Sequence, residues 1–99
     1  MISMVHDLKC WPPFFQDILD GKKTADVRRD DRPGGFQAGD YLHLREWVPD
    51  EANLSTGHYT GRDLTARVRH IVQGGQFGIQ KGYVVMSVRV IYPHAPNSE

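Results

Sequence analysis

The sequence predicts an α+β domain that is mainly β: a small antiparallel β-barrel with one prominent helix near its N-terminus. The predicted elements are one strand, one short helix and then about four more strands, which leaves too few helices for a parallel α/β fold. Short loops join most of the strands, and this favours antiparallel pairing. An open sheet of this size would expose two edges, and closure into a barrel plugged by the helix would remove them.

Length and composition fit one small globular domain. The chain has 99 residues, 39% hydrophobic and 24% charged, and its 12 Lys and Arg balance its 12 Asp and Glu. A neutral chain argues against a general polyanion binder, because such domains are usually basic. No apolar run is long enough for a membrane span, and the polar start predicts no secretory signal. We expect a cytoplasmic protein with its domain over residues 1–92 and a flexible tail over residues 93–99.

The cysteine and histidine content predicts neither a disulfide nor a metal centre. Cys10 is the only cysteine, so an internal disulfide cannot form and a cysteine-rich zinc site is excluded. The five histidines show no spacing typical of metal ligands. We expect Cys10 to be a buried, small apolar residue. We expect the protein to be a monomer that needs no metal and no cofactor.

The first half of the chain predicts a strand, a helix and a second strand. The first strand covers Val5 to Lys9, and the prolines that follow Trp11 suit the first turn of a helix. From Phe14 to Asp20 the apolar side chains fall on one helical face. The next strand covers Thr24 to Arg29 and alternates, with Ala25 on its apolar face and its charged residues on the other. This pattern predicts a half-buried strand with a polar outer face.

The second half predicts three strands separated by loops. The strands cover Asp40 to Trp47, Tyr59 to Val72 and Tyr83 to Ile91, and the second is bent near Gly61. The intervening loops, at 30–39, 49–57 and 74–78, are rich in turn-forming residues. We interpret the last of these as a hairpin loop; a flap over a cleft, with Phe77 at its tip, is the alternative.

The most informative residues for function lie at the corner between the helix and the next strand. A purely structural interpretation explains each residue type there: glycine ends the helix, lysines complement its dipole and threonine starts a strand. It does not explain why a lysine, an acid and an arginine crowd this corner. The residues concerned are Gly21, Lys23, Thr24, Asp26 and Arg28.

This pattern, Gly-x-Lys-Thr-x-acid-x-Arg, resembles the signature of the ASCH domain, a branch of the PUA-like superfamily. The resemblance extends from Val5 to Val90, and the glycine-rich closing segment resembles a phage and bacterial subfamily of unknown function. It implies a β-barrel with a cleft between barrel and helix, lined by the lysine, the acid and the arginine of the signature. It also implies binding of RNA or a nucleotide, while some relatives hydrolyse acylated cytidine or RNA.

We predict that the chain binds single-stranded RNA or a nucleotide in this cleft. Lysine and arginine would contact phosphates, and the acid would accept a hydrogen bond from a base edge. Trp11, Trp47 and Tyr83 are candidates for stacking on an unpaired base. A neutral domain suits a short strand better than a long duplex. The predicted site consists of Lys9, Lys23, Thr24, Asp26, Arg28 and Glu46.

Two alternatives remain open at the level of sequence. The first is a hydrolase of modified cytidine or RNA, with Lys23 as base and Asp26 orienting it or activating water. The acylcytidine hydrolases match at Lys23, but their threonine falls at Asp26, and Gln73 to Lys81, the region of their glutamate, holds no carboxylate. Glu46 could replace it if its strand borders the cleft. The second alternative is a protein-interaction adaptor.

Overall fold

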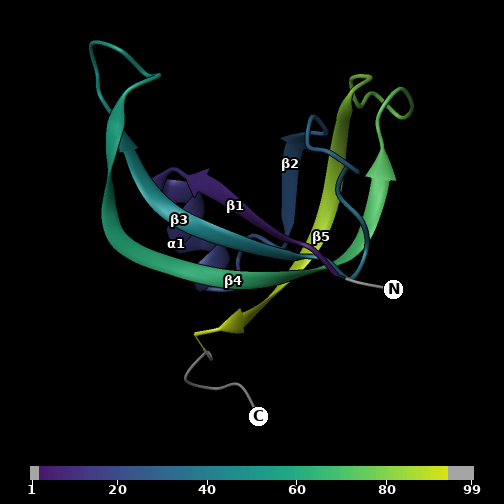
Figure 1. Cartoon of the computed structure of the whole chain (residues 1–99), viewed down its shortest axis with the longest axis horizontal. Helices are drawn as coiled ribbons and strands as arrows, with labels where there is room; N and C mark the ends of the chain where they lie inside the picture. The colour runs from purple at the N-terminus through teal and green to yellow at the C-terminus, as the bar shows by residue number, and fades with distance from the viewer. Residues whose placement is uncertain (1–2, 94–99) are drawn as a thin grey trace.

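The computed structural model describes residues 3–93, and this part of the chain forms five strands and one helix (Figure 1). All the predicted elements are present, with bounds that differ by a few residues. The last residues of the predicted tail, 94–99, lie outside the described residues. The elements are β1 (Val5–Cys10), α1 (Pro12–Leu19), β2 (Ala25–Arg29), β3 (Tyr41–Pro49), β4 (Gly57–Gln73) and β5 (Tyr83–Tyr92).

The strands form one curved sheet in the order β1-β3-β4-β5-β2. The prediction of antiparallel pairing is correct for β3 with β4, β4 with β5, and β5 with β2. It is wrong for β1, which pairs parallel with β3. The chain between these two strands passes through α1 and β2, so it is long enough to return β3 in the same direction as β1.

Within the described residues the sheet stays open, so the predicted closed barrel is wrong. Strands β1 and β2 are the two edges, and no backbone ladder joins them. Two arginine side chains reach across instead. Arg28 Nη1 donates to the carbonyl of Lys9 at 3.1 Å, and Arg32 Nη2 donates to the carbonyl of Asp7 at 3.0 Å. These hydrogen bonds occupy edge carbonyls of β1 that a neighbouring strand would otherwise take.

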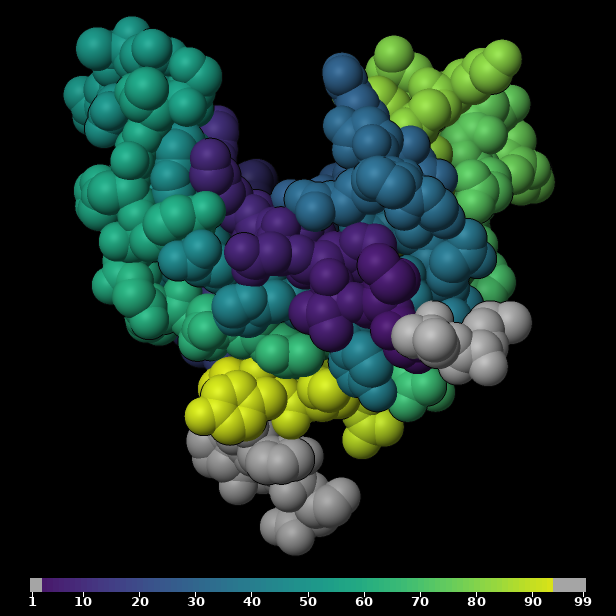
Figure 2. Space-filling view, in the orientation of Figure 1, coloured from purple at the N-terminus to yellow at the C-terminus, as the bar shows by residue number. Residues whose placement is uncertain are grey.

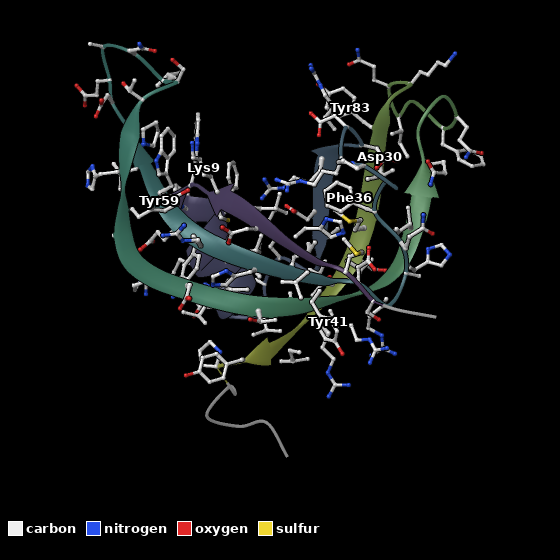
Figure 3. The ribbon with its side chains drawn as sticks, viewed as in Figure 1. Lys9, Asp30, Phe36, Tyr41, Tyr59 and Tyr83 are labelled. Atoms are coloured by element: carbon white, nitrogen blue, oxygen red, sulfur yellow. The ribbon has the colours of Figure 1, made fainter. Side chains whose placement is uncertain are left out.

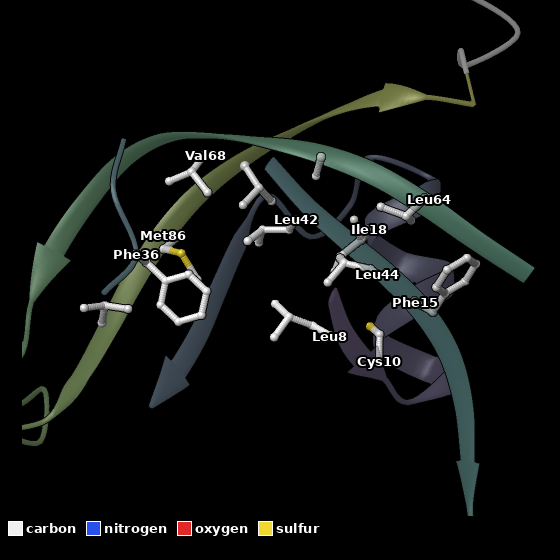
Figure 4. Packing of buried hydrophobic residues seen from close by; sticks show 13 residues of the cluster. Leu8, Cys10, Phe15, Ile18, Phe36, Leu42, Leu44, Leu64, Val68 and Met86 are labelled. Carbon is white, nitrogen blue, oxygen red and sulfur yellow. The ribbon is translucent and has the colours of Figure 1, made fainter. Parts of the chain in front are cut away.

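The core lies between the inner face of the sheet, the helix and the loop before β3 (Figure 4). Phe15 and Ile18 of α1 are each 1% exposed, as the predicted apolar face of the helix requires, but Phe14, which was expected on the same face, is 50% exposed. Phe36 of the loop covers another part of the cluster, beside Met86. The largest fully buried side chains from the sheet are Leu42, Leu44, Leu64, Val68, Val84 and Met86.

A buried polar pair ties the loop before β3 to the start of the chain. His6 Nε2 lies 2.8 Å from Oδ2 of Asp40, and both side chains are almost fully buried. The same carboxylate accepts hydrogen bonds from the backbone N–H groups of Met4 and Gln37. These partners offset the desolvation of the carboxylate and hold the loop against β1.

The long strand β4 is strongly curved, and it divides the sheet into two arms (Figure 1). It pairs with β3 along one arm and with β5 along the other, and its register slips twice against β5. Gly61 has a φ of +96° within β4, which supports the bend predicted near this residue. The arms end in the loops around residues 50–56 and 74–82 and enclose a notch, seen as a hollow in Figure 2.

Candidate functional site

A cavity of about 410 Å³ opens between the end of β1, the start of α1 and the edge strand β2. Lys9 lies on the inner side of the notch between the two arms (Figure 3). Four of the six predicted site residues line this cavity: Lys9, Lys23, Asp26 and Arg28. The other lining residues are Cys10, Trp11, Phe14 and Val27.

Strand β2 turns its charged residues toward the cavity, which reverses the prediction for its two faces. Asp26 is 6% exposed, whereas Val27 is 57% exposed. Arg28 is half-buried and Ala25 is exposed. The alternation itself is as predicted, but the polar side is the inner one. The polar side of β2 can face inward because Lys23 and the unpaired backbone carbonyls at the edge of β1 supply partners for its charged side chains.

Asp26 holds two cations, one on each carboxylate oxygen. Lys23 Nζ lies 3.3 Å from Oδ1, and Arg28 Nε donates to Oδ2 at 2.8 Å. Lys23 Nζ also donates to the carbonyl of Ala25, which fixes the lysine at the corner. Lys23 and Asp26 have opposite parity along the chain, and the corner before β2 brings them together. The buried carboxylate is thus compensated by charge and hydrogen bonds.

The cavity carries a formal charge of +2, because three cationic side chains and one carboxylate line it. Lys9 adds the third cation; its Nζ lies 4.7 Å from the ring centroid of Trp47, which is buried below. This charge favours an anionic ligand, and the exposure of Lys9 and the partial exposure of Lys23 and Arg28 leave these cations accessible to it.

Aromatic side chains form an apolar rim around this charge. Trp11 is 41% exposed and Phe14 is 50% exposed, and both line the cavity. Of the predicted stacking residues, only Trp11 lines this site. Trp47 is buried, and Tyr83 lies on the opposite arm in Figure 3, 5.7 Å from the Arg29 guanidinium. The sequence did not predict Phe14 as a site residue, because its apolar side chain fits the core face of the helix equally well.

Thr24 and Glu46 do not line this cavity. Thr24 lines a smaller cavity of about 220 Å³ between α1 and the end of β5, to which Lys23 also contributes. Glu46 is buried in β3, where its carboxylate accepts hydrogen bonds from Arg62 at 2.9 and 3.0 Å and from Thr60 at 2.7 Å. These bonds, chiefly those from Arg62, hold the pKa of Glu46 below its usual range.

Cys10 lies in the wall of the cavity as a buried thiol. It is 3% exposed, and burial raises its pKa to about 11. The thiolate is therefore scarce near neutral pH, which confirms the prediction of an apolar role. In residues 3–93 no three His, Cys, Asp or Glu side chains are grouped to hold a metal ion. No helix of this part of the chain has the length and apolar character needed to cross a membrane.

Comparison with known proteins assigns the chain to a family. Residues 5–88 match the family described as a domain of unknown function, DUF3850, and this range contains the whole cavity. The chain is also similar to an Escherichia phage P2 protein described as an uncharacterized 12.9 kDa protein in the GpA 3' region. The two are 35% identical over 71 residues, which cover 72% of this chain and 57% of the phage protein. The chain therefore belongs to the DUF3850 family of domains of unknown function.

Proposed function

We propose that this domain binds single-stranded RNA or a nucleotide in the cavity between α1 and β2. The inverted face of β2 carries the proposal: the strand buries Asp26 and exposes Val27, contrary to what folding alone favours. Natural sequences depart from such local preferences mainly at functional sites. Here the departure gathers cations in a cavity with an aromatic rim.

The cavity has the size and chemistry for one nucleotide. A volume of about 410 Å³ lies within the range of small-molecule sites. Lys9, Lys23 and Arg28 offer hydrogen-bond donors to a phosphate, and Trp11 offers a flat apolar surface to a base. An anion next to an aromatic platform is the combination that a nucleotide presents.

Asp26 acts in this proposal as a positioning residue for the two cations. Each of its carboxylate oxygens contacts one cation, Lys23 or Arg28, and two neighbouring cations make the carboxylate a weaker base toward water. Glu46 is held by Arg62 away from the cavity. These contacts favour binding over the alternative of a hydrolase that uses Lys23 and Asp26. Among the described residues, no contact specifically supports the alternative of a protein-interaction adaptor.

We also propose a relationship to the ASCH domains of the PUA-like superfamily, which is supported by the shared position of the signature residues Lys23, Asp26 and Arg28 in the wall of the cavity. The resemblance implies a closed barrel, whereas this sheet is open, with β1 and β2 as its edges. In this proposal the domain works in the cytoplasm as a monomer.

The proposal predicts that Lys23→Ala weakens ligand binding and that Lys22→Ala does not. The neighbouring Lys22 is exposed and lines neither cavity, so it is a matched control. Backbone-amide NMR titrations at low salt, with cytidine monophosphate, N4-acetylcytidine and an RNA octamer, would report the affinities. Loss of one phosphate contact should raise the dissociation constant about tenfold.

The same samples, analysed by mass spectrometry, separate the three functions. Shifts confined to residues around the cavity, with no product, support the proposal. Product that disappears in Lys23→Ala while binding persists would make the domain a hydrolase. Wild-type protein without shifts for any of these ligands would exclude both nucleotide functions and leave the adaptor.

A further inference from the structure

The hairpin between β4 and β5 ends in an unusual two-residue turn. Ile79 N–H donates to the carbonyl of Gln76 at 2.9 Å, and the two central residues, Phe77 and Gly78, have φ angles of +53° and +78°. Positive φ at both central positions is the pattern of a type I′ turn, whose first position favours Asn, Asp or Gly. Phe77 is the one non-glycine residue with positive φ among the described residues.

Phe77 also gains nothing from burial. It is 87% exposed, more than any other large hydrophobic residue in the described part of the chain. The position therefore combines an unfavourable backbone conformation with an aromatic ring held in solvent. A residue that is unfavourable both in its backbone conformation and in its exposure is expected to have a function other than stabilising the fold.

The arm that carries Phe77 is basic, and the opposite arm is acidic. Residues 28–32 and 73–83 contain four basic and two acidic residues, a net charge of +2 that includes Arg28 at the cavity and Arg32, whose side chain reaches across to β1. Residues 49–58 contain two acidic residues and no lysine or arginine, a net charge of −2. An anionic chain is therefore attracted to the arm with Phe77 and repelled from the other.

Strand β2 connects the cavity to this arm. Arg28 lines the cavity, and the next residue, Arg29, on the outer face of this edge strand, pairs with Tyr83 at the base of the loop. The Arg29 guanidinium lies 5.7 Å from the Tyr83 ring centroid, and Lys81 follows in the loop. Cations interleaved with aromatic rings are the pattern by which proteins follow a single strand of nucleic acid.

We propose that Phe77 stacks on an unpaired base of a single-stranded RNA that also places a nucleotide in the cavity. This inference rests on the proposed function and extends it, because it makes the ligand a strand that reaches from the cavity to the tip of the basic arm. The loop between β4 and β5 lies at the end of its arm (Figure 1), and the 87% exposure of Phe77 leaves its ring open to a base.

The test compares Phe77→Asn with wild type, using fluorescein-labelled octacytidylate and octauridylate, and cytidine monophosphate as a short probe. Asparagine suits the first position of a type I′ turn, so the variant should unfold at the same or a higher temperature than wild type. Loss of one stacking contact should raise the dissociation constant of the octamers about tenfold. Affinity for cytidine monophosphate should stay unchanged, since one nucleotide cannot span cavity and arm.

Two further variants sharpen the comparison. Phe77→Tyr keeps an aromatic ring and should retain octamer affinity. Leu54→Asn removes an exposed apolar side chain, 57% exposed, from the tip of the acidic arm and should leave octamer affinity unchanged.

The possible failures are distinguishable. If wild type binds neither the octamers nor cytidine monophosphate, the proposed function fails and this inference fails with it. If wild type binds both probes and Phe77→Asn keeps full octamer affinity, only the inference on Phe77 is overturned. An equal loss in Leu54→Asn would also overturn it.

Discussion

At the scale of single residues, hydrogen-bond partners decide what each charged side chain does. Asp26 and Glu46 are both buried carboxylates, each 6% exposed. Asp26 holds the two cations that line the cavity, whereas Glu46 serves the contact between helix and sheet. Local sequence does not separate these two roles, because each carboxylate lies on a strand beside an arginine.

His43 forms a pH-sensitive link across the outer face of three strands. Its Nδ1 lies 2.7 Å from Asp7 of β1, and its Nε2 lies 2.7 Å from Asp63 of β4. Both ring nitrogens can donate to carboxylates only in the protonated imidazolium. The hydrogen bond with Asp63, joined by that with Asp7, raises the pKa of His43 above its ordinary value of 6.5.

This link should stabilise the fold at acidic to neutral pH and weaken as the pH rises. Because the folded-state pKa of His43 is raised, its contribution is fully present below pH 6.5 and is lost as the pH passes the folded pKa. As the pH rises from about 5.5 to 8.5, the unfolding temperature of His43→Gln should fall less than that of wild type. His58→Gln, at an exposed histidine, should decline like wild type; a decline in His43→Gln as steep as in wild type would contradict this assignment.

At the scale of elements, an ion-pair network clamps α1 onto the arm formed by β3 and β4. Arg62 of β4 donates to Glu46 of β3 and to Oε1 of Gln16 in α1, the last at 2.9 Å. Its guanidinium also lies 4.9 Å from the ring centroid of Phe15. The helix therefore contacts the sheet through a charged cluster at its rim as well as through its apolar face.

Glu46→Gln should destabilise the fold and leave ligand affinity unchanged. The variant weakens hydrogen bonds to a buried carboxylate, at a cost of about 1 kcal/mol or more, moderated because Arg62 is half-exposed. Since the folded-state pKa of Glu46 is lowered, wild type should lose this contribution as the pH falls below 4.5, the ordinary value. Urea unfolding measures the change, with Glu51→Gln at an exposed position as control. A fall in affinity for cytidine monophosphate without a fall in stability would contradict this assignment and would mean that Glu46 takes part in ligand binding.

At the scale of the whole molecule, the open edge of the sheet creates the site. The gap between β1 and β2 is crossed by Arg28 and Arg32 side chains, and a backbone ladder there would place a strand pair where the cavity now opens. The loops at the ends of the two arms carry opposite net charge, so that a protein with no net charge still has a locally basic side.

The salt dependence of RNA binding measures how many of these cations take part. A strand also brings the phosphates that flank the nucleotide in the cavity, and if Lys9, Lys23 and Arg28 then neutralise one phosphate each, a plot of log K against log salt should have a slope of about −2. Fluorescence anisotropy with the RNA octamers, at several salt concentrations, gives this slope directly. Lys23→Ala should reduce its magnitude by about 0.7. A slope near zero would mean that binding involves no phosphate contacts at this site.

Local periodicity and turn residues, which are encoded in short segments, predicted the order and approximate bounds of every element, the amphipathic helix and the bend near Gly61. Lys9, Lys23, Asp26 and Arg28 were expected in one cleft on the strength of a family resemblance, and only the folded corner before β2 brings Lys23 and Asp26 together. Only the tertiary structure decided that β1 runs parallel to β3, that the sheet stays open, that Glu46 lies apart from the cavity and that β2 turns its charges inward. A period of two shows which side chains share a face of a strand, whereas the burial of that face depends on partners far away in the chain.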